Sequence, residues 1–271
     1  MKKDRRDFLK LAGCAAVAGV GSSTAFQSLL SGEAEAAGLK RAGTSKAMEG
    51  TRLAMVIDIK KFHQHRGLAE RCTQVCHSIH NVPDFGNPKD EIKWLWTENF
   101  ENTFVKDTHR HQTESLHGMP VLTLCNHCDN PPCVRACPTK ATFKKDDGVV
   151  AMDYHRCIGC RCCMAACPYG ARSFNWRDPR GTDEHGNPFI DELNPEYPAR
   201  DIGVVEKCNF CTERLAVGQL PACVEEAAEY EGMFFGDLND PDSEVSRVLR
   251  EEFTIVRQAS LGTYPSVFYI I

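Results

Sequence analysis

The sequence lacks several features that would point to common functions. Its formal net charge is −5, so it has no excess of the basic residues that bind nucleic acid. No stretch approaches the ~20 consecutive apolar residues of a membrane-spanning helix, so we expect any membrane contact to come through a partner. No nucleotide-binding loop, Ser-His-Asp arrangement or pair of carboxylates stands out, so no catalytic residues are expected. The informative residue is cysteine, which occurs 15 times.

Residues 1–36 are expected to be an export signal rather than part of the fold. Arg5 and Arg6 precede a weakly apolar run at 11–21, a pattern typical of a twin-arginine signal peptide, and residues 34–36 fit a cleavage site. The run is too short for a membrane anchor, and almost no apolar segment precedes Cys14, which disfavours lipidation there. The sequence therefore predicts a protein at the periplasmic (extracytoplasmic) face of the cytoplasmic membrane.

The cysteine spacings differ from a disulfide framework, which is the default interpretation for an exported protein. One run is C-x2-C-x2-C-x3-C-P over residues 157–168, the spacing of bacterial ferredoxins whose thiolates ligate a [4Fe-4S] cluster. Gly159 lets the backbone fold tightly around the sulfurs. A second run over residues 125–138 has the same form with two extra residues in the middle gap.

These two runs are expected to complete one another, because the last cysteine of each run ligates the other cluster in two-cluster ferredoxins. The predicted first site comprises Cys125, Cys128, Cys133 and Cys167. The predicted second site comprises Cys157, Cys160, Cys163 and Cys137. A zinc site would have two CxxC-like pairs without a third cysteine and a trailing Cys-Pro in each run. Cys162 is surplus and is interpreted as a packed neighbour.

Two further runs are incomplete in a complementary way. Residues 208–223 supply three cysteines, and Ala227 stands where the fourth would be. Upstream, Cys72 and Cys76 survive, whereas the earlier positions hold Phe62, His63, His65 and Ala69. If the last cysteine of each run ligates the other cluster, the missing cysteines of both runs belong to one cluster. The other cluster then keeps all four ligands. The predicted third site comprises Cys208, Cys211, Cys223 and Cys76.

The sequence therefore predicts three [4Fe-4S] clusters on these twelve cysteines, with Cys14, Cys72 and Cys162 unassigned. An alternative is a metal held by Cys72 with His63 or His65, because imidazole is a common ligand. Cluster assembly needs reduced thiols and the periplasm is oxidising, so the protein should fold around its metal before export. The twin-arginine route, which transports folded proteins, fits this requirement.

The expected fold class is α+β, with two ferredoxin-like modules, one inserted within the other, and loop-rich insertions. Strands are expected at 53–59 and 121–124, and a hairpin at 146–148. Aromatic residues such as Trp94 and Trp96 are interpreted as core, with partner docking as the alternative. The expected divisions are 1–36 (signal), 50–83 plus 203–236 (split one-cluster module), 84–118 (insertion), 119–176 (complete two-cluster module), 177–202 (loop insertion) and 237–271 (C-terminal tail after a helix capped by Asp240).

The four cysteine runs, with EKCNFCTERL at 206–215 and FGDLNDPDSEV at 235–245, resemble the iron–sulfur subunits of the dimethyl sulfoxide reductase, polysulfide reductase and NrfC type. The resemblance covers most of residues 50–271. The export signal and the eroded cluster pair look most like the DsrO subunits of Dsr (DsrMKJOP) membrane complexes.

The resemblance implies an electron-transfer subunit that relays single electrons in sulfur or sulfate metabolism. Its partners would be an NrfD-like integral membrane subunit that reacts with quinone, such as menaquinone, and a multihaem cytochrome c or a further iron–sulfur subunit. The second site would lie nearest the membrane, the first next and the third farthest. The eroded site corresponds to the cluster that faces the catalytic subunit in molybdenum-containing relatives. The erosion therefore disfavours a molybdopterin partner. A subunit of a periplasmic molybdopterin oxidoreductase is the alternative, and a zinc-binding scaffold is the non-redox alternative.

Overall fold

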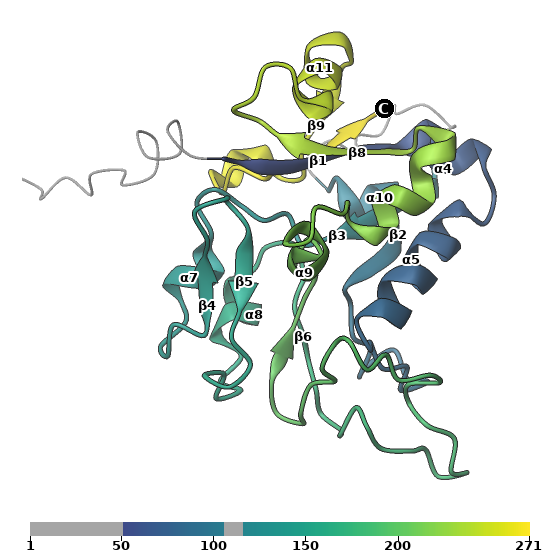
Figure 1. The fold of residues 1–271 in the computed structure, drawn as a ribbon, viewed down its shortest axis with the longest axis vertical. Coiled ribbons are helices and arrows are strands. Elements are labelled where there is room, and N and C mark those ends of the chain that lie inside the picture. The colour runs from purple at the N-terminus through teal and green to yellow at the C-terminus, as the bar shows by residue number, and fades with distance from the viewer. Residues whose placement is uncertain (1–50, 106–115) are drawn as a thin grey trace, which may run out of the picture. The chain divides into compact units, whose positions relative to one another are not determined.

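The computed structural model describes residues 51–105 and 116–271 (Figure 1). The expected signal sequence and Cys14 lie outside the described residues. The described chain mixes short helices with short strands, as the α+β class requires. The nesting of one ferredoxin-like module within another stays a prediction.

A four-stranded sheet in the order β8-β1-β10-β9 joins the two ends of the described chain (Figure 1). Its strands are β1 (Leu53–Asp58), β8 (Met233–Asp237), β9 (Thr254–Ile255) and β10 (Val267–Ile270). β1 pairs antiparallel with β8 and parallel with β10, so it is a central strand. Successive residues of a strand face opposite sides, and both sides of β1 are covered. Ala54 and Val56 pack in one buried cluster, and Met55 and Ile57 pack in another.

The C-terminal part differs from the expected helix and tail. Helix α11 (Glu244–Glu251) starts later than predicted because the Ser243 hydroxyl, rather than Asp240, caps it. The predicted tail is strand β10, whose Val267 and Tyr269 are fully buried. β10 pairs with β1 from the other end of the chain, a contact that no local pattern reveals.

Three helices cover the Met55 and Ile57 side of the sheet. They are α4 (Ile59–Gln64), α5 (Leu68–Ile79) and α10 (Ala222–Ala227), and the 3-10 helix η2 (Ala228–Tyr230) follows α10. α5 buries Leu68, Cys72 and Cys76, which are spaced four apart and so share one face. This face packs against α10.

Short paired strands lie around the cysteine runs. They are β2 (Leu95–Asn99) with β3 (Pro120–Leu124), β4 (Thr142–Lys144) with β5 (Val150–Met152), and β6 (Ser173–Phe174) with β7 (Val205–Glu206). The predicted strand at 121–124 is β3, and the predicted hairpin joins β4 and β5 through Gly148, whose φ is +84°. The pairing of β6 with β7 brings the chain back after residues 177–202, which hold no helix or strand.

The remaining helices are one or two turns long. They are α6 (Phe100–Thr103), α7 (Pro132–Arg135), α8 (Cys162–Ala166), α9 (Thr212–Leu215) and the 3-10 helix η3 (Ala259–Leu261). α7 and α8 contain Cys133 and Cys163, so each helix lies within its cysteine run.

The aromatic residues of the 84–118 insertion fill the core. Trp94 is fully buried and its Nε1 donates to Glu206 Oε2 at 2.9 Å. Trp96, Phe100 and Phe104 are also buried. Buried rings offer no surface to a partner, so the core interpretation holds and docking by Trp94 and Trp96 is excluded.

Candidate metal centre

The four cysteines of the first site line one small cavity. Cys125, Cys128 and Cys133 come from the loop after β3 and from α7, and Cys167 comes from the end of the other run. Burial, together with the charge of the neighbouring Cys125, raises the pKa of Cys128 to about 12. Burial and Cys125 also raise the pKa of Cys167, so the fourth thiol faces the other run.

The four cysteines of the second site line a separate cavity together with Gly159. Cys160 is exposed, Cys157 and Cys137 are half-buried and Cys163 is buried, so this is the most open of the three places. Burial works to raise the pKa of Cys137, but hydrogen bonds outweigh it and lower that pKa, including one from Thr142 N to the sulfur at 3.5 Å. An N–H that donates to sulfur favours the thiolate.

Gly159 is held against the backbone that returns to β7. Its φ is +68°, and a Cβ there would lie 2.3 Å from Gly203 O and 3.0 Å from Phe174 Cε2. No side chain fits at that distance, so the tight turn of the second-site loop depends on glycine.

The third site brings α5, the turn before α9 and α10 together. All four of its thiols are buried. Burial raises the pKa of Cys76, and the charges of Cys208, Cys223 and Cys211 raise it further, so the four thiols face one another. Phe210 N donates to Cys208 Sγ at 3.5 Å.

The chemistry of these sets fits a metal cluster. The fourteen cysteines of the described residues form no disulfide. Burial and like charge oppose ionisation of grouped thiols, whereas bound metal supplies the positive charge that makes thiolates stable. In each place, three thiols from one run meet a fourth from a distant segment, which suits the four-thiolate ligation of a [4Fe-4S] cluster.

Apolar side chains fill the space near the eroded fourth set. Ala227 and Leu68 are fully buried and Phe62 nearly so. A Cβ on Gly232 would meet Phe62 Cε2 at 3.3 Å, Leu68 Cδ2 at 3.4 Å and Ala227 Cβ at 3.6 Å. Little room for a fourth cluster remains beside Ala227.

Cys72 and the nearby histidines form no evident metal site. Cys72 Sγ donates to Cys223 O at 3.5 Å, and burial raises its pKa to about 12. The ring centroids of His65 and Tyr230 lie 4.5 Å apart, and His63 is exposed. Within the described residues, the one group of three potential ligands whose donor atoms all lie within 4.8 Å of one another, close enough to share a single ion, is a different one, namely His80, Cys211 and Glu213.

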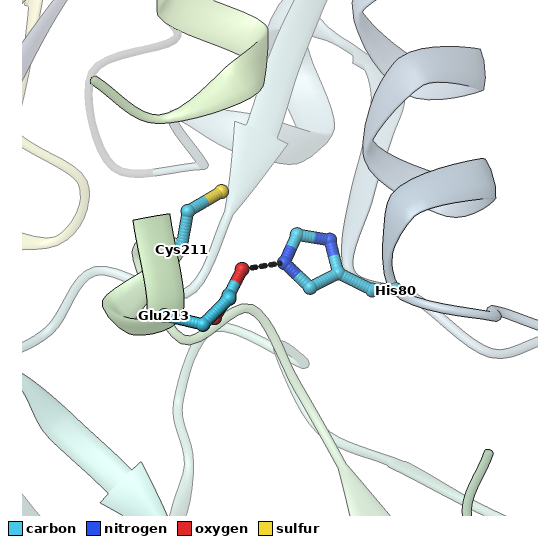
Figure 2. Close-up of side chains that lie close together, drawn as sticks. All are labelled: His80, Cys211 and Glu213. Atoms are coloured by element: carbon cyan, nitrogen blue, oxygen red, sulfur yellow. Dashed lines mark hydrogen bonds and ion pairs between the residues drawn. The ribbon is translucent and has the colours of Figure 1, made fainter. Parts of the chain in front are cut away.

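This His80 group was missed by the sequence analysis and is drawn in Figure 2. His80 Nε2 lies 2.8 Å from Glu213 Oε1, and Nδ1 lies 2.8 Å from the carbonyl oxygen of Cys76. Burial works to raise the pKa of Glu213, but the hydrogen bond and charge of His80 lower it. Because Cys76 and Cys211 belong to the third site, the pair lies directly beside it. The available signal was the spacing of His80, which caps the C-terminus of α5 four residues after Cys76.

Comparison with known proteins agrees with this chemistry. The model of the 4Fe-4S dicluster domain matches residues 119–181. The chain is 37% identical to the Hdr-like menaquinol oxidoreductase iron-sulfur subunit 1 of Archaeoglobus fulgidus, over 98% of this chain and 97% of the relative. It is 36% identical to the arsenate respiratory reductase iron-sulfur subunit ArrB of Shewanella sp., over 81% and 96%. It is 33% identical to the menaquinone reductase iron-sulfur cluster-binding subunit of Nitratidesulfovibrio vulgaris, over 80% and 87%.

The chain belongs to this family of iron–sulfur subunits. The resemblance to the dimethyl sulfoxide reductase, polysulfide reductase and NrfC type is confirmed, and the chain is an electron-transfer subunit with [4Fe-4S] clusters. The dicluster match includes the first and second sites, whereas the third-site cysteines lie outside it. Among the described residues of this iron–sulfur subunit, no helix is long and apolar enough to cross a membrane.

Proposed function

We propose that this subunit relays single electrons through three [4Fe-4S] clusters, held by the first, second and third sites. The carrying observation is that each of three groups of four thiols combines one cysteine run with a residue from another. When bound, the clusters supply one-electron carriers, and the polypeptide supplies thiolates, N–H donors to sulfur and burial.

Contacts between the sites support a row in which the first site is central. Cys133 of the first site and Cys163 of the second pack in one small buried cluster. On the other side, the charge of Cys125 raises the pKa of Cys208, beyond the larger effects of burial and Cys211, so the first and third sites are also neighbours. The open second site is the entry or exit that the resemblance assigns to the membrane side.

The proposed partners are a quinone-reactive NrfD-like membrane subunit and a further redox subunit, either a multihaem cytochrome c or an iron–sulfur protein. Two relatives support the quinone partner, because they are named as subunits of a menaquinol oxidoreductase and a menaquinone reductase. Periplasmic placement through the twin-arginine route and a DsrO-like role in sulfur metabolism are part of the same proposal. They rest on Arg5, Arg6 and the eroded fourth set.

A catalytic reductase partner, such as a periplasmic molybdopterin oxidoreductase, is the second candidate. The relative named as an arsenate respiratory reductase subunit favours it. The apolar packing of Phe62, Leu68 and Ala227 argues against it, because the cluster expected to face such a partner has little room.

Anaerobic purification of the native complex tests the proposal. We expect about twelve iron and about twelve acid-labile sulfide per chain, EPR signals of interacting reduced clusters, and an NrfD-like membrane protein in the same complex. Co-purification of a molybdopterin subunit instead would favour the second candidate. Zinc without sulfide would overturn both, and about eight iron would leave one site unused.

A further inference from the structure

Two cations are buried among the cysteine sites without an acidic partner. Lys207 is 1% exposed and Arg172 is 4% exposed. Among the ion pairs of the described residues, neither side chain pairs with a carboxylate. Arg200 is buried to a similar degree, but Glu206 neutralises it. Burying an unpaired cation is unfavourable unless a nearby anion compensates.

Lys207 lies between the first and third sites. Its Nζ donates to the carbonyl oxygens of Val150 and Cys208, the latter at 2.7 Å. Val150 lines the first-site cavity, and Cys208 is a proposed ligand of the third site. The ammonium group therefore lies between the two sites.

Arg172 lies between the first and second sites. It lines the first-site cavity, and its Nη1 donates to Thr142 Oγ1 at 3.2 Å. Nη1 also donates to Met152 Sδ at 3.2 Å, and both Thr142 and Met152 line the second-site cavity, so the guanidinium lies between the two sites. Its Nη2 is buried with no hydrogen-bond partner.

Each junction in the row therefore holds one unneutralised positive charge. Four thiolates around a cluster make each loaded site negative, and reduction adds further negative charge. A fixed cation in a water-poor junction stabilises that added electron on both flanking sites, because Coulomb energies are large where the dielectric constant is low. The first site lies next to both cations, and the outer sites each lie next to one.

We propose that Arg172 and Lys207 are positioning residues for electron transfer. Each raises the reduction potentials of the two clusters that flank it, and together they keep the central first-site cluster reducible. The inference rests on the proposed three-cluster function. It predicts potential shifts at two of the three sites for each residue, a pattern that a general structural defect would not produce.

The test is an EPR-monitored redox titration of the purified holoprotein with single substitutions. Arg172→Gln and Lys207→Gln remove the charge but keep a hydrogen-bond donor. Arg172→Gln should shift the first- and second-site potentials to more negative values and leave the third unchanged. Lys207→Gln should shift the first and third and leave the second unchanged.

Arg156→Gln is the matched control, because Arg156 also neighbours a ligand in sequence, Cys157, but is 66% exposed and pairs with Asp153. Its removal should leave all three potentials in place, because solvent screens the charge. The charge-retaining variants Arg172→Lys and Lys207→Arg should titrate like the wild type.

Unchanged potentials in both glutamine variants, or equal shifts at all three sites, would overturn the inference while leaving the relay intact. Absence of iron and sulfide in the wild type would instead overturn the proposed function. If a glutamine variant loses iron, the iron content and potentials of the charge-retaining variant at the same position decide whether the inference holds. Restored iron with wild-type potentials supports the charge role, and continued loss of iron refutes it.

Discussion

Substitution Gly159→Ala should selectively damage the second site. At φ +68° an alanine costs about 1 kcal/mol. Its Cβ would also lie 2.3 Å from Gly203 O, whereas ordinary contacts begin near ~3.4 Å, so the two loops must separate by about 1 Å. The Gly203 backbone resists this movement because its N–H donates to Asn175 O at 2.8 Å.

Forced overpacking of this kind typically costs about 1–3 kcal/mol, so the total is about 2–4 kcal/mol. For a domain of this size, the thermal midpoint should fall by roughly 5–15 °C. Gly170→Ala is the control, because its φ is +64° but nothing lies within 4 Å of its Cβ position. Its thermal midpoint should fall by only about 2–4 °C, because the positive φ is the only cost.

The assay is iron content with thermal bleaching of the visible cluster absorption, followed for both variants under anaerobic conditions. Gly159→Ala should lose about four of about twelve iron atoms, and the second-site EPR signal should disappear first. Equal thermal shifts and full iron content in both variants would refute the argument from the Gly203 contact.

The remaining predictions concern cysteines outside the second site. Cys76→Ser should remove about four of about twelve iron atoms, whereas Cys72→Ser, one turn earlier on the same buried face of α5, should remove none. Iron loss from Cys72→Ser alone would contradict the third-site assignment. Cys162 is exposed, so its interpretation from sequence as a packed neighbour is wrong. In the folded holoprotein an alkylating reagent should therefore modify Cys162, as mapped by peptide mass spectrometry. Cys72 should react only after unfolding, because burial raises its pKa to about 12 and keeps it a thiol at neutral pH. Rapid labelling of Cys72 would show that α5 does not pack as described.

The elements that sequence could predict are those with local causes. Strands β1 and β3 and the hairpin turn at Gly148 follow from short apolar runs and turn residues. The grouping of cysteines follows from ligand spacing, which is a constraint of the cluster rather than of the fold.

The features that sequence could not predict depend on distant partners. β10 looks like a tail until β1 lies beside it. Asp240 and Ser243 are both good helix caps, and only the packing of α11 on the sheet selects Ser243. The burial of Lys207 and Arg172 has no local signal, because a lone basic residue is usually solvated and only the fold buries it.

The sheet explains how the proposed third site can keep its geometry although the fourth cysteine set is eroded. β1 leads through α4 into α5, and α10 leads into β8, so the pairing of β1 with β8 holds the two helices together independently of any metal. Where a cluster would otherwise crosslink them, Phe62 and Leu68 are buried, each contributing about 1.5–3 kcal/mol by leaving water. Apolar packing therefore does the structural work of the missing cluster, and Cys76 is still presented to α10. On this reasoning Ala227→Cys adds a thiol but no metal site, because the facing positions hold hydrocarbon rather than ligands.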